Sequence, residues 1–106
     1  MSTSYRRYEI LLPRRFNGGQ PIPPRWLTEA VIELRERFGG ASCETQIIQG
    51  EWEEEGEIYH DELVRVFVDA EDTPANRDFF LQFRDRLKAR FRRLAIWMTS
   101  HPIDVL

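Results

Sequence analysis

The chain has 106 residues, a formal net charge of −3 and 42% hydrophobic residues, among them seven Phe, three Trp and three Tyr. A chain of this length and composition can bury a core without disulfides or metal, which argues against disorder and predicts one domain over residues 1–106. The single cysteine, Cys43, excludes an intramolecular disulfide. No apolar run approaches the roughly 18 residues of a membrane span, and the first residues lack the apolar segment of a secretion signal, so we expect a cytoplasmic protein without a membrane partner.

The first half of the chain predicts a strand followed by a helix. Residues 5–12 alternate loosely between the two faces of a strand, and Pro13 ends it. After a loop rich in Gly and Pro, we expect a helix over residues 24–38, because prolines occupy its first turn and apolar residues recur at helical spacing. Gly39 then suits the left-handed backbone that ends a helix.

The second half begins with an expected hairpin and a second helix. Residues 42–53 and 57–69 predict two strands, and Gly56 in the connecting turn can adopt the positive φ of a short hairpin loop. Thr73 and Pro74 are typical of an N-cap and a first helical position. An apolar stripe at spacings of three and four then indicates an amphipathic helix. The stripe consists of Phe80, Phe83, Leu87, Phe91 and Leu94.

A fourth strand completes the order of elements. Residues 94–99 predict this strand, which His101 and Pro102 are expected to end before an apolar tail. The order β-α-β-β-α-β is typical of an α+β ferredoxin-like plait, a four-stranded antiparallel sheet with two helices on one face.

Two short strings carry a resemblance to known proteins. Residues 50–52, Gly-Glu-Trp, lie in the hairpin, and residues 38–40, Phe-Gly-Gly, close the first helix. With the element order, these strings resemble small bacterial single-domain proteins that have a ferredoxin-like plait. The resemblance implies the strand order 4-1-3-2, and it implies no particular activity.

The acidic stretch of residues 51–63 contains seven carboxylates and one histidine. Adjacent residues on a strand point to opposite faces, so His60 and Asp61 cannot share a site, and His101 is expected at the far end of the sheet. We therefore expect no metal within one chain, while a site across a dimer stays open. So many carboxylate pairs can be drawn here that none indicates a catalytic pair. We interpret the stretch as a solvated hairpin tip that pairs loosely with nearby arginines.

Other chemical sites have weak support. Arg14 and Arg15, with the amides of Gly18 and Gly19, could form an anion site, but the spacing is not that of a phosphate loop. Cys43 is expected to be a small buried hydrophobe rather than a nucleophile. We predict no catalytic residue and no cofactor. Nucleic acid is not expected either, because the sheet offers one outward aromatic residue beside an acidic hairpin.

The sheet face without helices is the most informative feature. If Val64, Val66 and Val68 face the helices, the opposite face mixes polar groups with large apolar ones, which a solvated face should not do. A second copy or the C-terminal tail is expected to cover it. Whether Trp52 and Trp97 belong to this face or to the core stays open. The predicted interface residues are Leu11, Leu63, Phe67, Ile103 and Leu106.

Two functions remain from the sequence. The first is a non-catalytic interaction or ligand-binding module that self-associates, with a dimer as the expected form. The alternative is a small enzyme whose cleft forms on the open sheet face between two copies, with Tyr59, His60, Arg65 and Trp97 as its candidate groups. For an unidentified small molecule the candidate ligand-binding residues are Arg14, Arg15, Tyr59, His60, Arg65 and Trp97.

Overall fold

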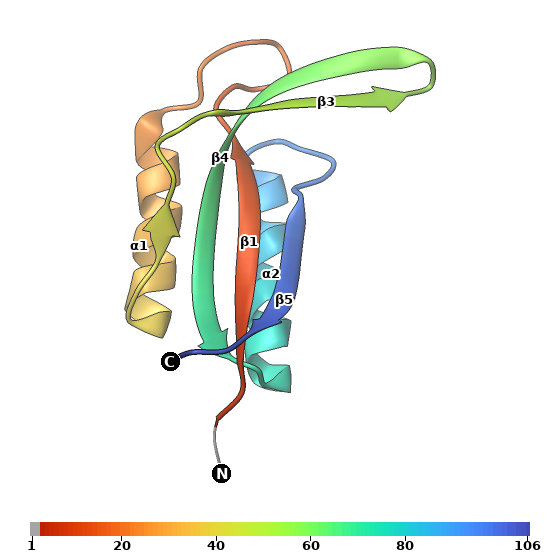
Figure 1. The fold of residues 1–106 in the computed structure, drawn as a ribbon. Helices are drawn as coiled ribbons and strands as arrows, with labels where there is room; N and C mark the ends of the chain where they lie inside the picture. The colour runs from red at the N-terminus through yellow and green to blue at the C-terminus, as the bar shows by residue number, and fades with distance from the viewer. Residues whose placement is uncertain (1–2) are drawn as a thin grey trace.

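The computed structural model describes residues 3–106. It contains one antiparallel sheet of five strands, with both helices on the same face (Figure 1). The α+β class and the ferredoxin-like arrangement predicted from the sequence are confirmed. The elements in chain order are β1 (Tyr5–Pro13), α1 (Pro24–Phe38), β2 (Ser42–Cys43), β3 (Ile48–Glu54), β4 (Glu57–Glu71), α2 (Pro74–Arg90) and β5 (Met98–Ile103).

The sheet has one strand more than the sequence predicted. Its order is β2-β4-β1-β5, and β3 pairs with the other part of β4. The predicted second strand is divided because residues 44–47 lie opposite only residues 64–65 of β4, which leaves two extra residues as a bulge. An insertion of two residues preserves the alternation of faces. With β2 and β3 taken together, the expected order 4-1-3-2 is present.

The helix boundaries follow the local signals in the sequence. Helix α1 has the predicted bounds, and Gly39 closes it with a φ of 83°. Thr73 caps α2, because its side-chain oxygen accepts a hydrogen bond of 3.1 Å from the backbone N–H of Asn76. The β3-β4 turn is also as expected, since Glu55 and Gly56 both have positive φ, at 51° and 80°.

The core lies between the sheet and the helices. Alternate residues of β1 and β4, including the predicted Val64, Val66 and Val68, point toward α1 and α2. Tyr8 stacks on Phe80 with ring centroids 3.8 Å apart. The largest fully buried side chains are Phe80, Phe83, Phe91, Ile10, Leu12, Leu34, Leu87, Val66 and Val68.

The chain after α2 departs from the prediction. Leu94, expected in the apolar stripe of the second helix, is 92% exposed because the helix ends at Arg90 and the backbone turns at Arg92, where φ is 55°. The last strand starts at Met98 rather than at residue 94, and it continues through Pro102 instead of ending there. Pro102 is tolerated because β5 is an edge strand, where a missing N–H interrupts no ladder on its free side.

The prediction that Cys43 is buried is wrong. The residue lies in β2, an edge strand of two residues, and its free thiol is exposed. The edge strand leaves too little structure around the side chain to enclose it.

Candidate functional site

A two-stranded arm projects from the end of the sheet (Figure 1). Strand β4 has 15 residues, of which residues 63–71 pair with β1, while residues 57–63 pair with β3. We call residues 48–62 the hairpin arm. Because β1 ends at Pro13, no strand in the described chain pairs with the arm on its other side. A hairpin without a third strand is only marginally stable in water, so the contacts at its base matter.

A buried ion pair fixes the base of the arm. The guanidinium of Arg93 donates two hydrogen bonds, of 2.6 and 3.2 Å, to the carboxylate of Asp61. Both side chains are shielded, with 7% of Asp61 and 12% of Arg93 exposed. Arg93 also donates a bond of 2.7 Å to the carbonyl of Arg15 in the first loop. The pair therefore connects the arm, the first loop and the chain that follows α2.

Glu62 makes a second set of contacts at the base. Its carboxylate lies 3.1 Å from Nη1 of Arg14 and 3.7 Å from Nε of Arg15. These side chains are more exposed than the Asp61 pair. The predicted pairing between hairpin carboxylates and arginines is thus present at the base of the arm rather than at its tip. Within residues 3–106, the tip glutamates Glu53, Glu54, Glu55 and Glu57 form no ion pair.

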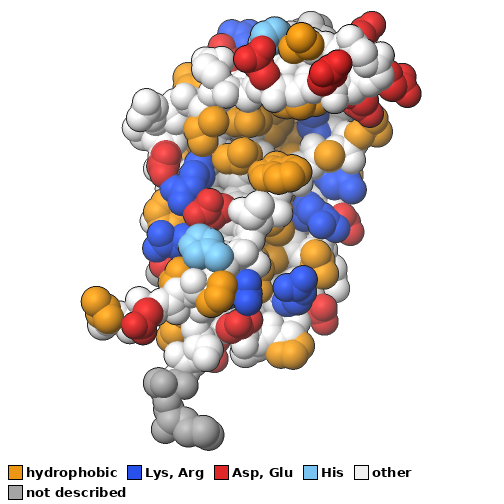
Figure 2. Space-filling model, turned by 45° about the vertical axis from the view of Figure 1, so that its right-hand side comes forward, with side chains coloured by type: hydrophobic (Ala, Val, Ile, Leu, Met, Phe, Trp, Pro, Cys, Tyr) orange, Lys and Arg blue, Asp and Glu red, His pale blue; other side chains and the backbone are white. Residues whose placement is uncertain are grey.

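A hollow of about 480 Å³ lies between the arm and the open face of the sheet. Figure 2 shows apolar side chains gathered below the acidic upper lobe of the molecule. Polar groups from Glu54, Asp61 and Arg93 also reach this space, which we call the arm hollow. Its large apolar side chains are Leu11, Pro13, Trp52, Leu63, Ile96 and Trp97.

A second concavity of about 290 Å³ lies on the other side of the arm's base. We call it the outer hollow, and Arg15, Tyr59 and His60 line it. Tyr59 stacks on Trp52 with ring centroids 6.5 Å apart. Nδ1 of His60 lies 3.5 Å from a carboxylate oxygen of Glu51 on the paired strand. Three side chains, Trp52, Asp61 and Arg93, line both hollows and form the wall between them.

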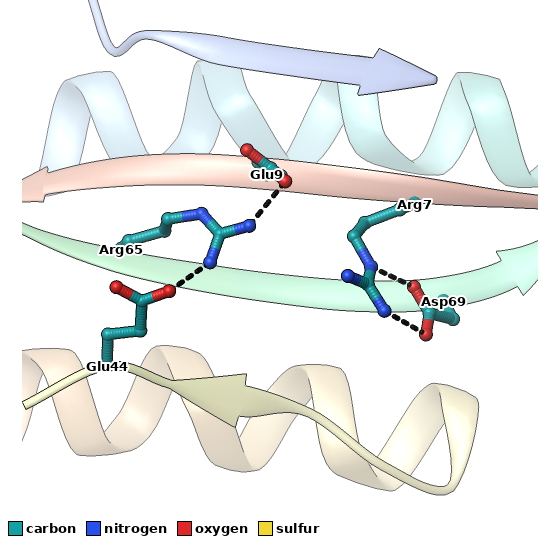
Figure 3. Close-up of polar contacts among 5 residues, drawn as sticks. All are labelled: Arg7, Glu9, Glu44, Arg65 and Asp69. Carbon is teal, nitrogen blue, oxygen red and sulfur yellow. Dashed lines mark hydrogen bonds and ion pairs between the residues drawn. The ribbon is translucent and has the colours of Figure 1, made fainter. Parts of the chain in front are cut away.

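The rest of the open face is a charged network (Figure 3). Arg7 binds both carboxylate oxygens of Asp69, at 2.7 and 3.0 Å, and Arg65 bridges Glu9 and Glu44. The Cζ atoms of both arginines lie 4.6 Å from the ring centroid of Phe67. The predicted outward position of Phe67 is confirmed, and its ring is half-buried under two guanidinium groups.

The network changes the acidity of its carboxyl groups. The hydrogen bond from Arg65 holds the pKa of Glu9 below its ordinary value of 4.5, and the bond from Arg7 lowers the pKa of Asp69 below 3.8. Burial opposes both changes, and the ion pairs outweigh it.

This network should make stability depend on pH on the acid side. The folded state holds fewer protons at Glu9 and Asp69 than the unfolded state, so their contribution is complete above about pH 5 and is lost as the pH falls through the lowered pKa values. We expect the variant E9Q/D69N to lose less stability than the wild type between about pH 7 and about pH 3, measured by urea unfolding. Parallel losses in the two proteins would contradict this account.

The candidate ligand residues from the sequence separate into several places. Arg15, Tyr59 and His60 share the outer hollow, whereas Trp97 lines the arm hollow. Arg65 lies in the charged network. Arg14 lines a third concavity of about 310 Å³ between the first loop, α1 and β4. The six residues therefore do not form one site.

The predicted interface residues are also distributed. Leu11 and Leu63 line the arm hollow, and Ile103 pairs with Tyr5 at the end of β5. Leu106 is fully exposed beyond that strand. The open question about the tryptophans is answered, because Trp52 and Trp97 are 41% and 70% exposed and do not belong to the core. His101 and His60 lie on different strands, and no group of three His, Cys, Asp or Glu side chains suited to a metal occurs in residues 3–106.

Sequence reasoning missed the Asp61–Arg93 pair and the exposure of Ile58 and Leu94. The pair joins residues 32 positions apart, so no local pattern indicates it. A signal for the arm did exist. The predicted strand of residues 57–69 is longer than its predicted neighbour, residues 5–12. Part of the longer strand therefore had to extend past the end of the shorter one.

Comparison with known proteins gives a likeness of fold. No protein-family model matches the chain, and no curated protein matches its sequence. A phage SAM lyase, solved in complex with S-methyl-5'-thioadenosine, has a TM-score of 0.69 at 11% identity, over 99% of this chain and 93% of its own. The likeness concerns the fold alone.

Two further structures share the arrangement. The divalent cation tolerance protein CutA1 of Thermus thermophilus has a TM-score of 0.66 at 14% identity, over 96% of this chain and 86% of that one. CutA1 of Ehrlichia chaffeensis has a TM-score of 0.64 at 9% identity, over 100% and 87%. These structures support a small ferredoxin-like α+β fold. Among residues 3–106, no helix has the length and apolar character to span a membrane.

Proposed function

We propose that the chain is a non-catalytic binding module that self-associates through its hairpin arm. The observation that carries this proposal is the exposure of large apolar side chains on an arm that no third strand among residues 3–106 supports. Ile58 is 64% exposed, Tyr59 43% and Trp52 41%. An isolated hairpin with such a surface gains stability when a partner covers it.

The chain itself offers a matching surface for a second copy. Leu94 and Trp97, at 92% and 70% exposure, lie in the loop that precedes β5, which also contributes to the arm hollow. Packing one copy's arm against this loop of another would remove both groups from water, and apolar burial is the main favourable term in association. The C-terminal residues Ile103 and Leu106 remain a second candidate contact, because β5 has a free edge that can pair with another strand.

A binding role is favoured over catalysis by the separation of the polar candidates. An enzyme needs its reacting groups to converge on one point. Here Arg15, Tyr59 and His60 share the outer hollow, but Trp97 lines the arm hollow and Arg65 is engaged by Glu9 and Glu44 in the charged network. The cation tolerance for which two structural neighbours are named is not carried over, since the described chain brings no three metal-ligating side chains together.

The test of self-association is the mass in solution. We expect light scattering or sedimentation at micromolar concentration to give a multiple of the 12.7 kDa chain mass. Ile58→Asp and Leu94→Asp should each shift the protein toward the single chain, because a buried carboxylate opposes the contact. Leu81→Asp, at a residue 39% exposed on α2, is the matched control and should leave the mass unchanged.

Circular dichroism would verify that each variant is folded. A wild-type mass of one chain would overturn the proposal of self-association. An assembly that Ile58→Asp and Leu94→Asp both leave intact would reject the arm as its contact surface.

A further inference from the structure

Two tryptophans from distant parts of the chain line the arm hollow. Trp52 comes from β3 in the arm, and Trp97 comes from the loop that precedes β5. Leu11, Leu63 and Ile96 supply further apolar surface to the same space of about 480 Å³. Figure 2 shows this region as a recess that opens to solvent below the arm. A recess of this size and lining can accept the apolar groups of a small organic molecule.

The charges around the arm hollow favour a positive ligand. Glu54 lines it and has no ion-pair partner among the described residues. Glu57 lies directly opposite Glu54 in the β3-β4 register and adds a second negative charge nearby. The one cationic side chain of the lining, Arg93, is neutralised by the two hydrogen bonds that it donates to Asp61. An anion would therefore meet uncompensated carboxylates in this space.

We propose that the arm hollow binds a small organic cation whose charged group carries apolar substituents, such as a quaternary ammonium. A cation of this kind is attracted to the electron-rich faces of indole rings, and its weak hydration makes transfer from water inexpensive. Trp52 and Trp97 supply the indoles, and Glu54 supplies the opposite charge. Inorganic divalent cations are strongly hydrated and need several oxygen ligands, which this apolar lining does not provide.

The inference deepens the binding half of the proposed function and does not depend on self-association. The proposed contact between copies would cover Trp97, which also lines the arm hollow, so choline binding is measured in Ile58→Asp, which keeps every residue of the hollow and is expected to shift toward the single chain. Choline binding is then measured from the indole signals of this variant and self-association from the solution mass of the wild type, so the two proposals can fail separately.

Choline and its neutral isostere 3,3-dimethylbutan-1-ol provide a direct test. The two molecules have the same shape and differ in one charge. We expect choline to shift the indole N–H signals of Trp52 and Trp97 in NMR titrations, and to bind about 10-fold more tightly than the alcohol. Trp26 packs against the core and serves as an internal reference whose signal should not move.

Two neighbouring glutamates give a matched pair of variants. Glu54 points to the arm hollow, whereas Glu53, the next residue on the strand, points to the other face. Glu54→Gln should weaken choline binding by about 3- to 10-fold, because it removes the paired charge and keeps the side-chain size. Glu53→Gln should leave the affinity unchanged.

Three outcomes would overturn the inference. The first is equal affinity for choline and the alcohol, which would mean that shape alone is recognised. The second is no shift of either indole signal at millimolar choline in a protein that is folded by circular dichroism. The third is an equal loss of affinity in Glu53→Gln and Glu54→Gln, which would indicate attraction to the acidic arm as a whole.

Discussion

Phe80→Ala is expected to lower the free energy of unfolding by about 3 to 5 kcal/mol. Phe80 is 1% exposed, and its ring stacks on Tyr8 and on Phe38 with centroids 3.8 and 5.1 Å away. Alanine would leave a cavity between the rings of Tyr8 and Phe38. Tyr8 belongs to β1 and Phe38 to α1, so the two rings cannot both move in to fill it. Urea unfolding followed by circular dichroism measures the loss.

The adjacent residue provides the control. Leu81→Ala, at a position 39% exposed on the same helix, should cost less than about 1 kcal/mol. Similar losses at the two positions would contradict the packing described for α2. Because small domains have a total stability of about 5 to 15 kcal/mol, the variant Phe80→Ala is expected to be near the limit of folding at room temperature.

The parts of the fold that the sequence predicted well have local causes. The bounds of α1 depend on Pro24 at its first position and on Gly39, whose positive φ excludes most other residues. The faces of β1 and β4 follow from alternation, which places Ile10 and Val66 in the core and Leu11 and Arg65 outside. Such signals lie within a few residues of the structure that they determine.

The parts that differed depend on contacts between distant residues. The bulge at residues 44–47 arises from the register with β4, which no property of these four residues specifies. Leu94 continued the apolar stripe in the sequence, but Arg93 turns toward Asp61, and the chain leaves the helical path before Leu94 can face the core. Residues 94–97 then cross to β5 as a loop, which leaves Trp97 exposed beside the arm hollow.

The candidate site was predicted less completely for the same reason. The sequence indicated an open sheet face with apolar groups, and Leu11 and Leu63 do line the arm hollow there. It did not indicate that, on the rest of this face, Arg7 and Arg65 form ion pairs with carboxylates of the same face. Apolar residues on both faces of the hairpin also left the place of Trp52 undecided until the register was known.

The arm's attachment leads to the second large expected effect. Asp61→Asn should lower the free energy of unfolding by about 3 kcal/mol or more, because it leaves the guanidinium of Arg93 buried without an opposite charge. Glu62→Gln is the neighbouring control. Its partners Arg14 and Arg15 are about half exposed, so this change should cost only about 0 to 1 kcal/mol. Urea unfolding of both variants measures the difference.

The location of the effect separates this account from general destabilisation. Arg93 joins Asp61 to the carbonyl of Arg15, and this connection is a buried polar link between the arm and the body of the protein. Asp61→Asn should therefore speed hydrogen exchange in residues 48–62 more than in β1, whose amides are protected by the sheet on both sides. Equal acceleration in the arm and in β1 would mean that the pair stabilises the whole fold and does not anchor the arm. Since Trp52 and Asp61 form the wall between the two hollows, a loosened arm should also weaken choline binding.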